Sequence, residues 1–85
     1  MCGIIAKLGS DDAVDELLSG LGNLEYRGYD SAGIALKNGH ALEIVKRAGK
    51  IDNLRDALDG ALPSGSVGIG HTRWSTHGPP TDENA

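Results

Sequence analysis

The only cysteine of this 85-residue chain stands at position 2, directly after the initiator methionine. Initiator methionine is removed when the next residue is small, and removal would make Cys2 the first residue. Its free α-amine, with an ordinary pKa of about 7.7–8.0, would then lie within reach of the thiol and could act as its general base. Cys2 is therefore a candidate nucleophile, beside which Gly3 leaves room for a substrate. A retained Met1 would block this chemistry, and a buried, unreactive cysteine is the alternative.

The three aromatic residues, Tyr26, Tyr29 and Trp74, are confined to two short polar segments, 25–31 and 71–78. Aromatic side chains bury large areas and are usually spread through a core. Here they accompany Arg, Asp, His and Thr. The two segments are therefore either parts of a ligand site or structured surface loops.

Arg73 carries a planar fork of N–H donors that suits a carboxylate. Its position in a loop after an expected strand, beside Trp74 and Thr76, favours a ligand clamp over a surface ion pair. His71 and His77 could bind a metal, but one cysteine and three histidines without a close-spaced pair are atypical of zinc sites. No metal is expected, and a Cys2–His77 dyad remains an alternative.

Hydrophobic periodicity predicts the order β-α-β-β-α-β, followed by an open loop over 72–85. The first strand covers 3–8 and reads as buried on both faces. The first helix follows caps at positions 10–12, and Gly20 and Gly22 within it indicate close approach to another element. The remaining expected elements are a strand over 31–36, a turn at Asn38-Gly39, an antiparallel strand over 41–48, a helix with the stripe Ile51, Leu54, Leu58 and Leu62 closed by Gly60 and Pro63, and a strand over 66–71.

Composition excludes several classes of protein. The net charge of -4 argues against nucleic-acid binding, which needs a clustered basic face. No apolar run is long enough for a membrane span, and one cysteine cannot form an internal disulfide. A cytoplasmic globular chain is expected. Its core would be thin, because leucine, isoleucine and valine total 19 residues and phenylalanine is absent.

Three segments match a known family: Cys2-Gly3-Ile4-Ile5, residues 24–33 and residues 70–78. They resemble the glutaminase domain of glutamine–fructose-6-phosphate aminotransferases (isomerizing), which are class II glutamine amidotransferases. The first segment is shared by other class II enzymes, whereas the two longer ones in this order are specific. The resemblance runs along the whole chain. It implies the α+β fold of the N-terminal-nucleophile (Ntn) hydrolases, with antiparallel sheets packed against helices and residues 1–85 forming an incomplete N-terminal portion of the domain.

The resemblance also implies roles for individual residues. Cys2 would attack the side-chain amide of L-glutamine, form a thioester and release ammonia before water completes the reaction. Arg73 would pair with the α-carboxylate of glutamine. No cofactor is implied. The remaining implied site residues are Trp74, Thr76 and His77 in a loop that closes over glutamine, and Arg27 and Gly28 at the nucleophile end.

Two departures from the family pattern are visible. Ser75 replaces the usual alanine, and little effect is expected from this change. The Asn-Gly pair of the family's oxyanion hole, and the acidic residue that reads the amine of glutamine, would lie beyond Ala85. Because one oxyanion donor is worth about 10²–10³ in rate, the 85-residue chain alone is expected to be inactive. A further region with sugar isomerase folds would bind fructose 6-phosphate and make glucosamine 6-phosphate.

Two other functions remain open. One is a non-catalytic short module that binds a carboxylate ligand or a partner. The other is a different class II enzyme of the asparagine or purine pathway, which Arg73-Trp74 and the segment 26–31 disfavour. Strands without partners also predict that the chain self-associates into homo-oligomers.

Overall fold

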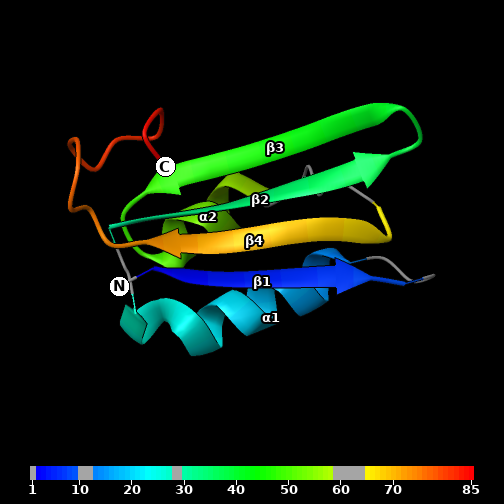
Figure 1. Ribbon diagram of the computed structural model, residues 1–85, viewed down its shortest axis with the longest axis horizontal. Helices are drawn as coiled ribbons and strands as arrows, with labels where there is room; N and C mark the ends of the chain where they lie inside the picture. The colour runs from blue at the N-terminus through cyan, green and yellow to red at the C-terminus, as the bar shows by residue number, and fades with distance from the viewer. Residues whose placement is uncertain (1, 10–12, 28–29, 59–64) are drawn as a thin grey trace.

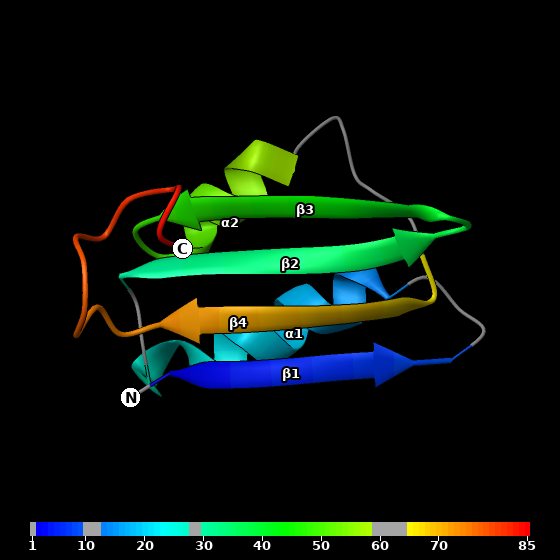
Figure 2. The ribbon, with the colours of Figure 1, turned by 45° about the horizontal axis from the view of Figure 1, so that its top comes forward.

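The computed structural model describes residues 2–9, 13–27, 30–58 and 65–85, apart from the side chain of Arg27. Its strands form one antiparallel sheet in the order β1-β4-β2-β3, and both helices pack on one face of it (Figures 1 and 2). The expected α+β architecture is confirmed. The elements are β1 (Gly3–Leu8), α1 (Val14–Leu24), the 3-10 helix η1 (Glu25–Arg27), β2 (Ser31–Asn38), β3 (Ala41–Ala48), α2 (Ile51–Leu58) and β4 (Val67–Arg73).

Helix α1 packs on the sheet through apolar residues that recur at helical spacing. Gly20 lies against Ile5 of β1, and a side chain there would collide with the end of the isoleucine. The predicted close approach is therefore confirmed at Gly20. At Gly22 an added Cβ would meet only Arg55, at an ordinary 3.5 Å. The N-cap of α1 is Ala13, without a side-chain cap bond, and positions 10–12 lie outside the described residues. The buried face of α1 consists of Val14, Leu17, Leu18 and Leu21.

Helix α2 buries Ile51, Leu54 and Leu58, as its periodicity predicts. The continuation of this stripe at Leu62, with its expected end at Gly60 and Pro63, lies outside the described residues. The Glu25 carboxylate of η1 accepts a hydrogen bond from the backbone N–H of Ile51 at 2.8 Å. This bond satisfies one of the amide donors at the start of α2 and ties the end of the first helical region to the second.

The hairpin differs from the prediction by one residue. Strand β2 continues through Asn38, which pairs with Ala41, so the two turn residues are Gly39 and His40 rather than Asn38-Gly39. Gly39 has φ = +62°, which glycine adopts without strain. Strand β4 is also longer than predicted, because its pairing with β2 continues to the Ser31–Arg73 pair. Arg73 therefore ends a strand and does not lie in the loop.

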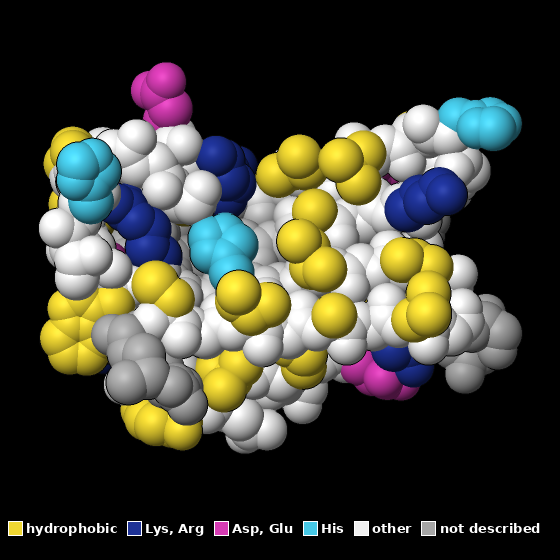
Figure 3. Space-filling model, viewed as in Figure 1, with side chains coloured by type: hydrophobic (Ala, Val, Ile, Leu, Met, Phe, Trp, Pro, Cys, Tyr) yellow, Lys and Arg dark blue, Asp and Glu magenta, His cyan; other side chains and the backbone are white. Residues whose placement is uncertain are grey.

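The second face of the sheet is open, so the prediction that β1 is buried on both faces is wrong. Ile4 and Leu8 are 74% and 84% exposed, and Ile69 of β4 is 55% exposed. Figure 3 shows hydrophobic side chains gathered over the strands on this face. An apolar run indicates that a strand is buried, but it does not show whether a second layer covers the other face of the sheet. Among the described residues, the core lies between the sheet and the two helices.

Gly68 of β4 offers a sharp test of this packing. A Cβ there would lie 2.9 Å from the backbone oxygen of Ala35 and 2.9 Å from Leu17 Cδ1. Gly68→Ala is expected to lower the free energy of unfolding by about 1–3 kcal/mol, the usual cost of overpacking. Urea unfolding measures it, with Gly22→Ala as the control that should stabilise by up to about 1 kcal/mol. Equal unfolding midpoints for Gly68→Ala and the wild type would contradict this packing.

Candidate active site

Cys2 lies at one end of the sheet, beside the end of β4. The next residue, Gly3, pairs with Thr72, and the Cys2 thiol is free and exposed. The backbone N–H of Trp74 donates to Cys2 Sγ at 3.4 Å. The alternative of a buried cysteine is therefore wrong. Met1 lies outside the described residues.

Close packing around position 3 explains why this residue is a glycine. A Cβ at Gly3 would lie 2.9 Å from Thr72 Oγ1 and 3.0 Å from Leu24 Cβ. The space beside Gly3 is thus filled by the chain itself on the helix-covered face. The missing side chain allows β1 to approach α1 and β4.

The Arg73 guanidinium is held by the loop that follows β4. Its Nη1 donates to the carbonyl of Pro79 at 3.2 Å, and its Nη2 donates to the carbonyls of Gly78, at 3.2 Å, and His77. Among the described residues, these three bonds engage both terminal nitrogens of the guanidinium. Arg73 therefore helps to shape the loop that follows β4.

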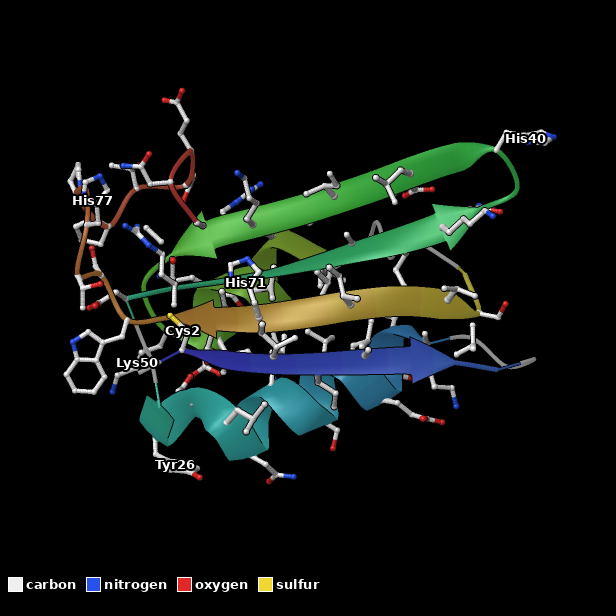
Figure 4. The ribbon with its side chains drawn as sticks, viewed as in Figure 1. Cys2, Tyr26, His40, Lys50, His71 and His77 are labelled. Atoms are coloured by element: carbon white, nitrogen blue, oxygen red, sulfur yellow. The ribbon has the colours of Figure 1, made fainter. Side chains whose placement is uncertain are left out.

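The loop carries the other predicted ligand-binding side chains. Trp74, Thr76 and His77 follow Arg73 directly and are exposed. The Ser75 hydroxyl donates to the carbonyl of Gly78 at 2.7 Å, so the serine that replaces the usual alanine adds a bond inside the loop. His77 and Cys2 lie well apart in Figure 4, which gives no support to a Cys2–His77 dyad. Gly28 and the side chain of Arg27 lie outside the described residues.

Sequence reasoning gave no role to two carboxylates that the structure places at this loop. Asp30 Oδ2 accepts the backbone N–H of Ser75 at 2.6 Å. Asp82 Oδ1 accepts the backbone N–H of Ala48, at the end of β3, at 2.6 Å. The only signal for Asp30 was its place in the polar aromatic segment. No sequence signal marked Asp82.

His71 pairs with Ile4, two residues along the chain from Cys2, and lies on the open face. Ile4, His71, Gly33 and Lys46 form one cross-strand row. Gly33 lacks a side chain, and a Cβ there would lie 2.9 Å from His71 Nε2 and 3.0 Å from Lys46 Cβ. Burial lowers the pKa of His71, and the positive charges of Lys46 and Arg73 lower it further.

This lowered pKa predicts that acid destabilises the fold. As the pH falls below the ordinary histidine pKa of 6.5, the unfolded chain takes up the proton before the folded chain. The free energy of unfolding is therefore highest above that pKa, falls as the pH approaches the folded pKa, and then levels off. His71→Gln should remove this part of the pH dependence, measured as urea midpoints at pH 7.5 and 5.5. The same pH dependence in both proteins would contradict the assignment.

Neither described helix is long and apolar enough to cross a membrane. In the ranges that the structure describes, no group of three or more His, Cys, Asp or Glu residues is placed to hold a metal ion. The three histidines lie separately in Figure 4, on the β2–β3 turn, on β4 and on the loop after β4.

Known proteins share most of their N-terminal sequence with this chain. No family model matches the chain. Over 85 residues it is 55% identical to the glutamine–fructose-6-phosphate aminotransferase (isomerizing) of Thermus thermophilus, and over 86 residues 52% identical to that of Streptomyces coelicolor. Both alignments cover all of this chain, which spans only 14% of the length of these relatives.

The fold is also found in a solved structure. The structure of glutamine phosphoribosylpyrophosphate amidotransferase from B. subtilis, complexed with ADP and GMP, superimposes with a TM-score of 0.79 and 27% identity. The match covers 91% of this chain and 17% of that one. The chain thus has the fold of the Ntn-hydrolase amidotransferases, and over its whole length it matches the N-terminal region of the glutamine–fructose-6-phosphate aminotransferase family.

Proposed function

We propose that this chain is the glutamine-hydrolysing front of an enzyme that makes glucosamine 6-phosphate from fructose 6-phosphate and L-glutamine. The observation that carries the proposal is the exposed Cys2 thiol, which accepts a hydrogen bond from the Trp74 N–H. It lies at the end of the sheet where β4 ends with Arg73. The 52–56% identity to enzymes of that name supports the substrates. Residues 1–85 would form the N-terminal portion of the glutaminase domain.

The reaction would begin at the Cys2 sulfur. After removal of Met1, the α-amine of Cys2 takes the thiol proton, and the sulfur attacks the amide carbon of the glutamine side chain. The new S–C bond forms and the C–N bond breaks, with the proton passing to the leaving nitrogen to give ammonia. Water then hydrolyses the thioester, which yields glutamate and restores the thiol.

Arg73 and its loop would bind the other end of glutamine. The Arg73 guanidinium suits the α-carboxylate because it carries a fixed positive charge and N–H donors that a carboxylate accepts. Thr76 and His77 are exposed on the same loop, where a closing movement would bring them to the ligand. Arg27 and Gly28 are proposed to support the nucleophile end.

The isolated chain is proposed to be inactive and to self-associate. It spans 14% of its relatives, so the groups that would bind the oxyanion and the sugar are assigned to other parts of such an enzyme. In the observed order β1-β4-β2-β3, the strands β1 and β3 form the two edges of the sheet, and edges can pair with a second copy. A cytoplasmic location is proposed with this function.

A fusion tests the function. Residues 1–85 replace the matching first 14% of the Thermus thermophilus relative, giving a chain called here the Thermus fusion. The fusion is expected to form glucosamine 6-phosphate from glutamine and fructose 6-phosphate, whereas the 85-residue chain alone releases no ammonia from glutamine. A folded fusion without glutamine-dependent activity would contradict the proposal, and ammonia release by the chain alone would contradict its inactivity.

A further inference from the structure

We propose that Asp30 and Asp82 are positioning residues that hold the two ends of the loop 74–81 to one turn of the fold, the Ala48–Gly49 corner between β3 and α2. Each carboxylate accepts a backbone N–H at 2.6 Å. Hydrogen bonds to ionised acceptors are short and roughly twice as strong as neutral ones. The role of this anchoring in glutamine binding rests on the proposed function, whereas the anchoring itself does not.

The first anchor, Asp30, holds the start of the loop in place. The backbone N–H of Asp30 donates to the carbonyl of Arg73 at 3.1 Å, and Asp30 Oδ2 accepts from Ser75 N. One residue therefore holds the positions on both sides of Trp74. Because the Trp74 N–H is the donor to Cys2 Sγ, the placement of this donor depends on Asp30.

The second anchor, Asp82, holds the far end of the loop in place. Asp82 Oδ1 accepts the N–H of Ala48, and Lys46 Nζ donates to the carbonyl of Glu83 at 2.9 Å. Asn84 Nδ2 donates to the carbonyl of Pro79 at 3.1 Å, which ties this segment back to the loop that holds Arg73. Figure 1 shows the chain after β4 returning to the end of β3.

Both anchors meet at neighbouring residues. The N–H of Gly49 donates to the Asp30 carbonyl at 2.7 Å, and the N–H of Ala48 next to it binds the Asp82 carboxylate. Gly49 has φ = +90°, a left-handed conformation that favours glycine. This turn thus places the N–H groups of Ala48 and Gly49 next to each other, where Asp82 and Asp30 accept them.

The test compares Asp30→Asn and Asp82→Asn with Glu83→Gln, which removes the same charge from a neighbouring side chain. Amide hydrogen exchange is measured by NMR on the 85-residue chain. Asp30→Asn is expected to speed exchange of the Ser75 amide, and Asp82→Asn that of Ala48, each about tenfold, the factor between hydrogen bonds to charged and neutral groups. Glu83→Gln should change neither, and the amides of β1 and β4 should keep their wild-type rates.

A second measurement separates positioning of the loop from support of the fold. In the Thermus fusion, Cys2 is alkylated by a diazoketone analogue of L-glutamine, which needs the bound loop, and by iodoacetamide, which needs only an exposed thiol. Both aspartate variants should slow the first reaction several-fold and raise KM for glutamine, and Asp82→Asn should leave the iodoacetamide rate unchanged.

The proposal is overturned if Ser75 and Ala48 exchange at wild-type rates in their variants, or if exchange accelerates throughout the sheet. Asp82 is exposed and follows the last strand of the sheet, so Asp82→Asn decides the question if Asp30→Asn does not fold. If the diazoketone does not alkylate Cys2 in the wild-type fusion, the proposed function is contradicted. The amide exchange rates of Ser75 and Ala48 then still test the two anchors.

Discussion

Replacing Cys2 with alanine is expected to abolish ammonia release from glutamine by the Thermus fusion. Loss of a covalent nucleophile lowers kcat by at least about 10⁴-fold in enzymes of this kind of mechanism. The thiol is exposed and accepts a bond from Trp74 N, so its removal takes away the reacting atom without opening a cavity in the core. The rate of ammonia formation at saturating glutamine measures the effect.

The control for this prediction is Ser75→Ala. It removes a hydroxyl from the loop beside Cys2 and breaks one bond, from Ser75 Oγ to the Gly78 carbonyl. Such a bond is worth about 0.5–1.5 kcal/mol, and activity should persist. Residual glutamine hydrolysis in Cys2→Ala near the wild-type rate would show that another group performs the attack.

Replacing Arg73 with alanine is expected to raise KM for glutamine by at least about 30-fold, since truncating one member of a hydrogen-bonded charge pair costs 2–5 kcal/mol. Two causes act together. The carboxylate of glutamine loses its charged partner, and the carbonyls of His77, Gly78 and Pro79 lose the donors that hold the loop. Arg73→Lys keeps the charge without the fork and should give an intermediate KM.

Arg55→Lys provides the matched control for Arg73. The Arg55 guanidinium also donates to a backbone carbonyl, that of Leu18 at 3.4 Å, but from α2. It should leave KM for glutamine unchanged. Initial rates against glutamine concentration measure these effects, and an unchanged KM in Arg73→Ala would remove Arg73 from the binding site.

The sequence predicts the elements well where the signal is local. The helical spacing of apolar residues from Val14 to Leu24 predicts α1, and the strand expected over 41–48 is β3 with the observed bounds. The predictions are wrong where the outcome depends on parts of the chain that are distant in the sequence. Arg73 is part of β4 because Ser31 pairs with it, and Ile4 is exposed because no second layer covers the sheet in the described chain.

The same distinction applies to the site. Cys2 and Arg73 are recognisable from residue type and from resemblance, since the motifs that carry them are contiguous. Asp30 and Asp82 hold backbone groups 45 and 34 residues away. Their partners are N–H groups, which every residue except proline supplies, so no side-chain pattern in the sequence marks either contact.

Peptide mapping by mass spectrometry tests the central claim, that Cys2 with a free α-amine attacks glutamine. The Thermus fusion is treated with the diazoketone analogue of L-glutamine, with and without L-glutamine as a protecting ligand. The account predicts an N-terminal peptide that begins at Cys2, carries the analogue on its sulfur and is protected by L-glutamine. An adduct on another residue, or an adduct on a peptide that still begins with Met1, would contradict it.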